Sequence, residues 1–210
     1  MLKLTYWPKR GRAEQVRLIL SLLGLEWEER NFDQDSPEHH AMQALGPAGG
    51  LMFASVPLLE DGDFGLVQGP VILGYLARRQ GLVDPTDLQS SSRADAIAWG
   101  AEDLRMAYFL LFGMGAERKQ RTFLTGRFRQ RWLPAFEGLL ALNSNDRFFV
   151  GDGFTQADVA VWDVLDSLVT WVPGSREAIS EHPRVHAWFE AFASEPRIAA
   201  YLASSRRPQS

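Results

Sequence analysis

The chain has 210 residues, 46% of them hydrophobic and 23% charged, with a formal net charge of −4 at pH 7, which indicates a globular protein with a sizeable core. The absence of cysteine excludes disulfide scaffolds, cysteine zinc sites and cysteine nucleophiles, and no apolar run reaches the ~20 residues of a membrane span, so we expect a soluble cytoplasmic protein without a membrane partner. Up to Gln80 there are 8 basic and 10 acidic residues and beyond it 14 and 16, so neither part has the positive charge that nucleic-acid binding needs.

The first 80 residues alternate between strand and helix patterns. Apolar runs of four to six residues indicate strands, and apolar residues spaced three and four apart indicate helices. Ser36 before Pro37 has the form of a helix N-cap, and Asp61-Gly62 is a strong hairpin signal. The predicted order βαβαββα consists of strand 2–6, helix 13–23, strand 27–32, a short helix after Ser36 that residues 46–50 end, strands 56–59 and 64–68, and a helix from Gly69 through Leu76.

Beyond Gln80 the pattern is helical throughout. Residues 81–89 have the composition of a linker, and Thr155-Gln156-Ala157-Asp158 has the form of a capping box in which Asp replaces the usual Glu. We therefore predict an α/β domain over residues 1–80 and an all-α domain over residues 90–210. Its predicted helices span residues 90–114, 120–142, 155–172, 183–194 and 196–203.

Two helix starts in the first domain are candidate ligand sites, because ligands of α/β sheets bind where strands end and helices begin. In the segment from Tyr6 to Arg12, Arg12 stands near a helix N-terminus, where the helix dipole disfavours a cation. Arg12 either faces an anionic ligand or extends into solvent, and Tyr6 is either a site residue or a half-buried packing residue. At Gln68-Gly69, main-chain N–H groups and a side-chain amide either hold a carboxylate or form a helix start without a ligand.

We predict no metal site. His182, His186 and Glu190 have ligand spacing on one helical face, but Pro183 places His182 at the helix edge and the pattern offers no fourth ligand. The basic residues between Arg118 and Arg131 are spread around a helix, and we interpret them as a solvated face.

Several segments, in this order and spacing, resemble the cytosolic glutathione transferases of the tyrosine type, closest to the pi class. Residues 6–12, Tyr-Trp-Pro-Lys-Arg-Gly-Arg, resemble that class's tyrosine–aromatic–proline–X–arginine–glycine–arginine segment. Further similar segments are Ser55-Val56-Pro57 with Gln68, Glu102 to Arg105 followed by Tyr108, and Val150 to Asp158. The resemblance covers nearly the full length and implies a thioredoxin-like N-terminal domain followed by an all-helical C-terminal domain.

The resemblance also implies how glutathione, the co-substrate, is bound in the first domain. Tyr6 would donate its hydroxyl proton to the glutathione sulfur, and Arg12 would support that pair electrostatically. The implied glutathione contacts are Ser55, Val56 and a cis Pro57 at the cysteinyl backbone, and Gln68 and the Gly69 N–H at the γ-glutamyl end.

Two further residues imply a homodimer. Asp103 would reach the glutathione of the neighbouring subunit, and Phe53 resembles the aromatic key that enters a helical pocket on the partner. The hydrophobic electrophile would bind where Trp7 and Lys9 lie on one side and Phe109 and Gly113 on the other, and pi-class enzymes usually carry a tyrosine in the place of Gly113.

The chain departs from the family pattern at the glutathione contacts. Gly69 occupies a position usually held by serine, Ser55 replaces a frequent glutamine, and neither tryptophan nor lysine occurs between Asp33 and Ser55. His39 or His40 would substitute for these two only weakly. Because each lost neutral hydrogen bond costs ~1 kcal/mol, we expect weakened affinity for glutathione.

The predicted function is a glutathione transferase that conjugates glutathione to hydrophobic electrophiles. Two alternatives remain open from the sequence. One is a non-catalytic member that binds apolar ligands or has a structural role, and the other is a glutathione-dependent isomerase or peroxidase, which would use the same activated sulfur.

Overall fold

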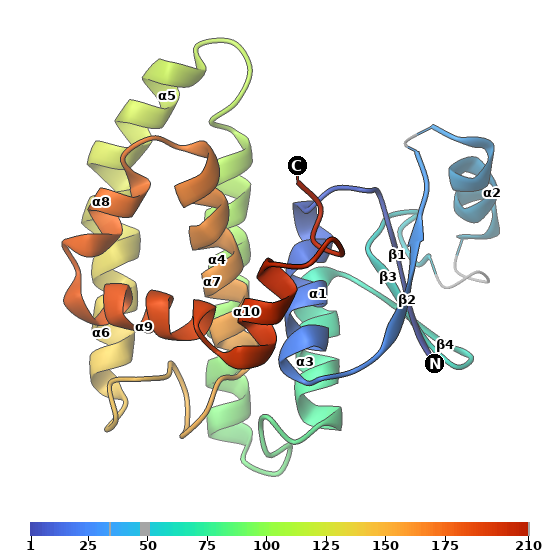
Figure 1. Cartoon of the computed structure of the whole chain (residues 1–210), viewed down its shortest axis with the longest axis horizontal. Helices are drawn as coiled ribbons and strands as arrows, with labels where there is room; N and C mark the ends of the chain where they lie inside the picture. The colour runs from blue at the N-terminus through green and yellow to red at the C-terminus, as the bar shows by residue number, and fades with distance from the viewer. Residues whose placement is uncertain (34, 47–50, 210) are drawn as a thin grey trace. The chain divides into compact units, whose positions relative to one another are not determined.

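The protein is described by a computed structural model that covers residues 1–33, 35–46 and 51–209. The chain forms two compact units, which Figure 1 draws with colours running from blue at the N-terminus to red at the C-terminus. The first unit comprises Met1–Gln80 together with Glu195–Ser210, and the second comprises Gly81–Ser194.

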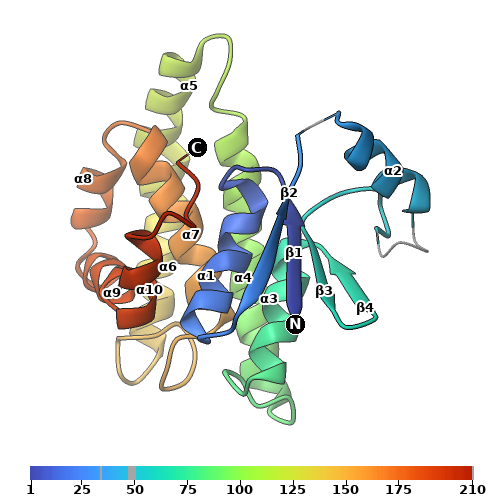
Figure 2. The same cartoon turned by 45° about the vertical axis from the view of Figure 1, so that its right-hand side comes forward.

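A four-stranded mixed sheet forms the centre of the first unit, and Figure 2 shows its strands side by side. The strand order is β2-β1-β3-β4, with β1 parallel to β2 and antiparallel to β3, and β3 paired antiparallel with β4. The strands are β1 (Leu2–Tyr6), β2 (Trp27–Asn31), β3 (Leu58–Asp61) and β4 (Phe64–Val67).

Helices lie on both faces of this sheet, and their order confirms the predicted βαβαββα pattern. Two of them, α1 and α3, cover one face, and α2 lies on the other side (Figure 2). A 3-10 turn, Gly11–Ala13, leads into α1, and the Ser36 hydroxyl caps α2 by accepting the His39 N–H at 3.2 Å. The helices are α1 (Glu14–Leu22), α2 (Pro37–Leu45), α3 (Gly69–Arg79) and the C-terminal α10 (Pro196–Leu202).

Several boundaries of the first unit differ from the predicted ones by one to three residues, and one of these differences lies at the edge of the sheet. The strand predicted for residues 56–59 begins at Leu58, because Pro57 has no N–H to donate to the sheet. The peptide bond between Val56 and Pro57 is cis. The cis form agrees with what the resemblance implied. Residues 47–50, which belong to the predicted break after α2, lie outside the described residues.

The described part of the second unit contains helices and no strand, as predicted. The longest helix, α4, packs along α7, and the large side chains Phe128, Trp162 and Trp188 are buried in the core. The helices are α4 (Leu88–Phe109), α5 (Ala116–Phe123), α6 (Leu133–Leu142), α7 (Gln156–Trp171), α8 (Ser175–Ser180) and α9 (Pro183–Ala193).

The predicted helices of the second unit differ from the observed ones in three main respects. The helix predicted for residues 90–114 ends at Phe109, because the following turn contains Gly113 and Gly115 at φ 79° and 70°. The helix predicted for residues 120–142 consists of α5, a π-helical segment Leu124–Trp132 with a kink at Gly126, and α6. The short helix α8 was not predicted.

The C-terminal residues were assigned to the helical domain, but they lie in the first unit, where they bind a buried carboxylate. Glu14, at the start of α1, is completely buried. Its Oε2 accepts a hydrogen bond from the Tyr201 hydroxyl at 3.0 Å, and its Oε1 accepts one from Arg207 Nε at 2.8 Å. Because a buried charge needs such partners, the C-terminal segment completes the first unit.

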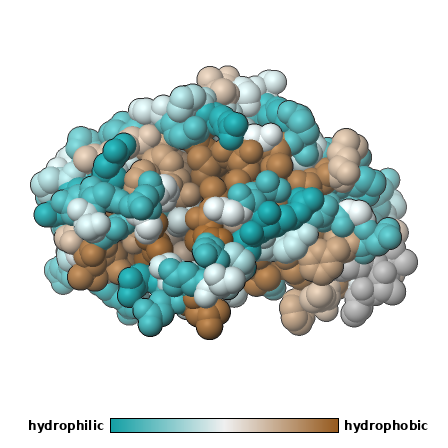
Figure 3. Space-filling view, turned by 90° about the horizontal axis from the view of Figure 1, so that it is seen from below, coloured by the Kyte–Doolittle hydropathy of each residue, from teal (hydrophilic) through white to brown (hydrophobic). Residues whose placement is uncertain are grey.

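Hydrophobic side chains are buried in both units and also reach the surface. Figure 3 shows hydrophobic residues between hydrophilic ones on one face of the molecule. In the described part of the chain, no helix combines the length and the apolar character that crossing a membrane requires.

The predicted capping box at the start of α7 is confirmed. Thr155 Oγ1 accepts the Ala157 N–H at 3.2 Å, and Asp158 Oδ2 accepts the Thr155 N–H at 2.9 Å. Asp158 Oδ1 also accepts the indole N–H of Trp188 at 2.8 Å, so one buried carboxyl group joins α7 to α9. Burial raises the pKa of Asp158 to about 6.

The bond between Tyr201 and Glu14 generates a stability prediction. Tyr201→Phe removes a donor from a fully buried carboxylate, so we expect the free energy of unfolding to fall by about 1.5–3 kcal/mol in urea titrations. Tyr75→Phe is the matched control, because the Tyr75 hydroxyl also donates to a carboxylate, that of Asp61 at 2.6 Å, but at a more exposed place. Equal losses in the two variants would contradict the role of burial.

The raised pKa of Asp158 predicts a pH dependence of stability. An unfolded aspartate loses its proton near pH 3.9, whereas folded Asp158 keeps it up to about pH 6. Unfolding in this window therefore releases a proton, and the free energy of unfolding falls as the pH rises, by about 3 kcal/mol in total from this group. Urea titrations between about pH 4 and 6.5 should show this slope in the wild type and a smaller one in Asp158→Asn. Parallel curves for both proteins would show that Asp158 does not titrate there.

Candidate active site

The register of the sheet brings three segments of the first unit to one edge. Thr5 pairs with Leu58, and Leu58 pairs with Val67 on its other side. The next residues in the same register are Tyr6, Pro57 and Gln68. The sheet therefore aligns three of the predicted site residues, which are far apart in sequence.

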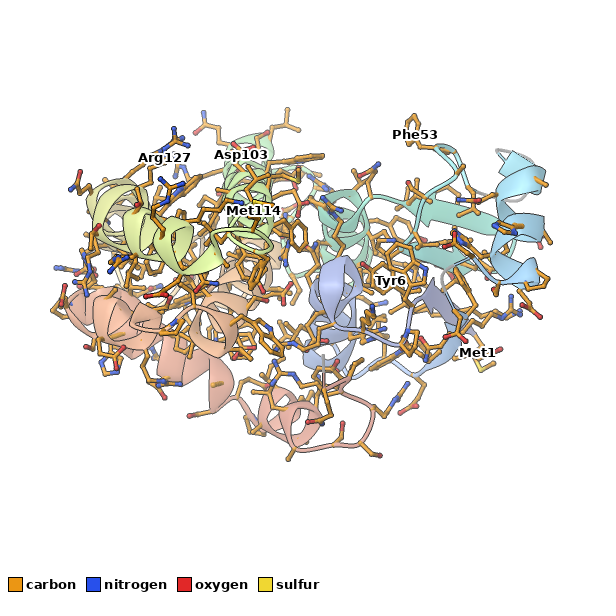
Figure 4. The ribbon with its side chains drawn as sticks, turned by 90° about the horizontal axis from the view of Figure 1, so that it is seen from above. Met1, Tyr6, Phe53, Asp103, Met114 and Arg127 are labelled. Carbon is orange, nitrogen blue, oxygen red and sulfur yellow. The ribbon has the colours of Figure 1, made fainter. Side chains whose placement is uncertain are left out.

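The hydroxyl group of Tyr6 is fixed by the turn that follows β1. Tyr6 is 4% exposed, and its hydroxyl oxygen accepts the backbone N–H of Arg12 at 3.0 Å. Gly11 has a φ of 42°, and a Cβ atom at this position would lie 2.5 Å from the Tyr6 hydroxyl oxygen. Only glycine allows this close approach, so Gly11 and Arg12 together determine where the hydroxyl lies. Tyr6 is labelled in Figure 4.

The turn itself is held by Arg17, which is completely buried on α1. Its Nη1 donates to the carbonyl oxygen of Lys9 at 2.9 Å, and its Nε donates to Glu29 on β2 at 2.9 Å. The hydrogen bonds with Glu29 raise the pKa of Arg17 against the opposing effect of burial, so this cation stays charged. The loop that carries the predicted site residues is thus attached to both α1 and the sheet.

The segment before β3 leaves the sheet at the edge described above. Ser55 is exposed, Val56 is half-buried and Pro57 is buried. Val56 packs against the small apolar cluster of Leu51, Leu58 and Val67. The peptide groups around Val56 lie beyond the last paired residues of β3, which is where an extended ligand would continue the sheet.

At the start of α3 the backbone adopts an unusual conformation. Gln68 has a φ of 75° and a ψ of 108°, a region that non-glycine residues rarely occupy. Gly69 follows it and is buried, while Gln68 itself is exposed. Strain of this kind is characteristic of binding sites, and the first turn of α3 offers its N–H groups to an anion, although Pro70 supplies none.

Around Tyr6 lies a group of aromatic rings. The Trp7 ring is 4.9 Å from the Tyr6 ring and 6.2 Å from the imidazole of His39, which stacks on Phe32 at 5.1 Å. His39 is 7% exposed, and its Nδ1 accepts the Asp35 N–H at 3.3 Å. His39 is therefore packed into this aromatic group, while His40 and Lys9 are exposed.

The other predicted site residues belong to the second unit. Asp103 is exposed on α4, Phe109 ends this helix with 38% of its surface exposed, and Gly113 lies in the turn that follows. No contact that the structure describes tests the predicted pocket lined by Trp7, Lys9, Phe109 and Gly113, and this pocket stays a prediction. In the described residues, no group of three or more His, Asp or Glu side chains is arranged to hold a metal ion.

Phe53 lies in the loop before β3, and Figure 4 shows its ring projecting away from the ribbon. It is 70% exposed, which is unusual for a phenylalanine. The second unit carries an apolar groove of about 290 Å³ between α4 and α6. Its lining includes Ala96, Ile97, Gly100, Ala135, Phe136 and Leu139.

Two structural residues of the site were not identified from the sequence. Gly11 was part of the quoted motif, but its contact with the Tyr6 hydroxyl depends on the path of the turn. Gln15 on α1 is 1% exposed and lies beside Gly69, and its Nε2 donates to the Arg12 carbonyl at 3.3 Å. A single glutamine in an amphipathic helix carries no signal for such a contact.

Comparisons with known protein families match both parts of the chain. A family model described as the N-terminal domain of glutathione S-transferase matches residues 2–78, and one described as its C-terminal domain matches residues 102–205. Glutathione S-transferase P 1 from Xenopus laevis is 31% identical over 212 residues, covering 97% of this chain and 92% of its own. Glutathione S-transferase Mu 1 from Oryctolagus cuniculus is 32% identical over 208 residues, covering 97% and 91%.

Solved structures give the same result at the level of the fold. A pi-class glutathione S-transferase from Onchocerca volvulus matches with a TM-score of 0.83 and 26% identity, covering 96% of this chain and 91% of its own. The glutathione S-transferase from Ascaris lumbricoides matches with a TM-score of 0.82 and 25% identity, covering 100% and 98%.

Proposed function

The chain belongs to the glutathione S-transferase family, and from this premise we propose that it is a tyrosine-type enzyme in which Tyr6 stabilises the glutathione thiolate for attack on hydrophobic electrophiles. The observation that carries the proposal is the Tyr6 hydroxyl, which is fixed by the Arg12 amide at 3.0 Å at the edge of the sheet. A hydroxyl held in one place before the ligand arrives stabilises a developing charge without reorganisation.

The chemistry requires a shift in the pKa of the glutathione thiol. A free thiol has a pKa of ~8.5, so only a few per cent is thiolate at neutral pH. A hydrogen bond to a charged group contributes about 1.5–3 kcal/mol, which corresponds to about one to two pKa units. One phenol donor is therefore sufficient to bring the thiolate to about half of the bound glutathione.

The Arg12 amide supports this role because of the direction of its hydrogen bond. The Tyr6 oxygen accepts from the N–H of Arg12, and in the proposal its own proton is donated to the sulfur. A phenol that accepts one hydrogen bond is a stronger donor in the next, since hydrogen bonds in a chain polarise one another. In the proposal the Arg12 guanidinium adds a positive charge near the sulfur.

The rest of the first unit would hold the tripeptide. In the proposal, Val56 bonds the cysteinyl backbone like an added strand, next to Ser55 and the cis Pro57, and Gln68 with the Gly69 N–H holds the γ-glutamyl end. The strained φ of Gln68 and the position of Val56 beyond the last pairs of β3 support these roles. The first unit is then the glutathione-binding domain, and Asp103 contacts the glutathione of a partner subunit.

The exposed Phe53 supports a homodimer. An apolar ring that is 70% exposed loses its contact with water when it enters an apolar groove on another molecule, and the groove between α4 and α6 offers such a surface. In the proposal, Phe53 of each subunit enters this groove on its partner, as an isologous contact of a two-fold dimer does. The cytosolic classes that the chain resembles suggest a cytoplasmic location and a role in detoxification.

The proposed role of Tyr6 predicts the behaviour of Tyr6→Phe. This variant has no hydroxyl group and cannot donate a hydrogen bond to the sulfur. We therefore expect the pKa of the bound thiol to rise by about one to two units and kcat to fall at least ~tenfold. Ultraviolet absorbance of the thiolate against pH, with turnover of an aryl halide, measures both. Tyr75→Phe loses a hydroxyl outside the site and should leave both values unchanged. An unchanged thiol pKa in Tyr6→Phe would remove Tyr6 from the mechanism.

The proposed dimer contact predicts that two unrelated substitutions dissociate the protein. Phe53→Ser removes the ring, and Gly100→Leu fills the groove at a position where an added Cβ meets nothing within 4 Å. Sedimentation velocity should show a weakened dimer for both. Trp171→Ser, which removes another exposed aromatic ring, is the control and should keep the state of the wild type. A dimer that survives both Phe53→Ser and Gly100→Leu would refute this contact.

A further inference from the structure

The space that a side chain at Gly69 would enter is occupied by the side chain of Gln15. A Cβ atom added there would lie 2.4 Å from Nε2 and 3.0 Å from Cδ of Gln15, and 3.5 Å from the carbonyl oxygen of Arg12. Real Cβ atoms essentially never show the first distance, and the second is tighter than nine in ten real Cβ contacts, so a side chain at Gly69 would require the Gln15 amide to move. The amide of Gln15, which comes from α1, thus occupies the space beside the start of α3.

The Gln15 amide also holds the turn that follows β1. Gln15 is 1% exposed, and its Nε2 donates to the carbonyl oxygen of Arg12 at 3.3 Å. A buried amide is costly unless it makes such hydrogen bonds, and leucine or methionine would fill the same volume without that cost. The glutamine at this position therefore has a polar purpose that packing alone does not explain.

Arg12 connects this amide to Tyr6. Its carbonyl oxygen accepts from Gln15, and its own N–H donates to the Tyr6 hydroxyl oxygen at 3.0 Å. Gly11 permits this contact, since a Cβ there would lie 2.5 Å from the same oxygen. A continuous path of contacts, all within the first unit, thus leads from Gly69 through Gln15 and Arg12 to Tyr6.

We propose that Gln15 is a positioning residue that couples the start of α3 to the Tyr6 hydroxyl, and that Gly69 is glycine because Gln15 needs its space. This inference rests on the proposed function, since it assumes that Tyr6 acts on the glutathione sulfur. It gives the departure at Gly69 a different meaning. The serine usual at this position is absent because the Gln15 amide, which orients Arg12, occupies the space that the serine side chain would need.

The first experiment separates the hydrogen bond of Gln15 from its volume. Gln15→Met fills the space but offers no donor to the Arg12 carbonyl. We therefore expect the pKa of the thiol of bound glutathione to rise by about 0.5–1 unit. The value of kcat/KM should fall about three- to tenfold at pH values below that pKa and return to that of the wild type well above it. A merely structural role would lower activity equally at every pH.

Gln156→Met is the matched control for this substitution. Gln156 is also completely buried, and its Nε2 donates to Asp95 at 3.1 Å, but it belongs to the second unit. This variant should lose stability without a shift of the thiol pKa. If Gln15→Met melts like Gln156→Met and leaves the thiol pKa at the wild-type value, the inference is overturned.

The second experiment is a double-mutant cycle between Gly69 and Gln15. Gly69→Ser alone should displace the Gln15 amide. It should raise the pKa of the bound thiol and lower kcat/KM at least as much as Gln15→Met does. In the background of Gln15→Ala, where the space is open, adding Gly69→Ser should cost less than about twofold. Independent, multiplying effects in the double variant would overturn the coupling.

The failure of this inference and that of the proposed function have different signatures. If Tyr6→Phe leaves the thiol pKa unchanged, the proposed function fails and the inference fails with it. If Tyr6→Phe raises the thiol pKa while Gln15→Met and Gly69→Ser do not, Tyr6 keeps its role and only the coupling is refuted.

Discussion

The site depends on one hydrogen bond, the donation of the Arg12 backbone N–H to the Tyr6 hydroxyl oxygen at 3.0 Å. The last strand pairs bring the phenol to the edge of the sheet, but the turn of residues 7–12 decides where its oxygen lies. The structure determines this turn from several sides: Gly11 allows the close approach, Arg17 binds the Lys9 carbonyl, and Gln15 binds the Arg12 carbonyl. Among substitutions at Arg12 only proline would remove this main-chain donor, and the donor changes position only when the turn moves. Preorganisation of the phenol is therefore a property of the fold of the whole loop.

The features that could be predicted from the sequence are those that depend on local residue patterns. The order βαβαββα, the Asp61-Gly62 hairpin, the Ser36 cap and the capping box at Thr155 depend on residues a few positions apart, and the structure has all of them. The features that were missed depend on long-range packing. No local pattern distinguishes a helix kinked at Gly126 from a straight one, and none shows that α10 packs on α1. Gly69 illustrates the same limit of local patterns. The sequence indicates only that a serine hydroxyl is missing there, whereas the structure places the side chain of Gln15 from another helix beside it.

In the proposed function, affinity for glutathione and activation of its thiol depend on different parts of the first unit. The turn after β1 and its supports from α1 would act on the sulfur. The departures at Ser55 and in the segment between Asp33 and Ser55 concern the grip on the rest of the tripeptide. These two properties are therefore free to change separately during evolution, and a weak grip does not imply a weak thiolate. The exposed Phe53 lies two residues before Ser55, so in the proposal the loop before β3 would contact both the ligand and the partner subunit.

The buried Glu14 has a consequence for how the chain acquires its structure. Its partners Tyr201 and Arg207 follow it at separations of 187 and 193 residues. On the ribosome, the sheet and its first helices emerge long before these partners exist, and the whole second unit is synthesised in between. The carboxylate at the start of α1 consequently remains without two of its donors until residues 201–207 have been synthesised. The turn of residues 7–12 lies just before that helix, so a segment made late in synthesis completes the helix that supports the turn.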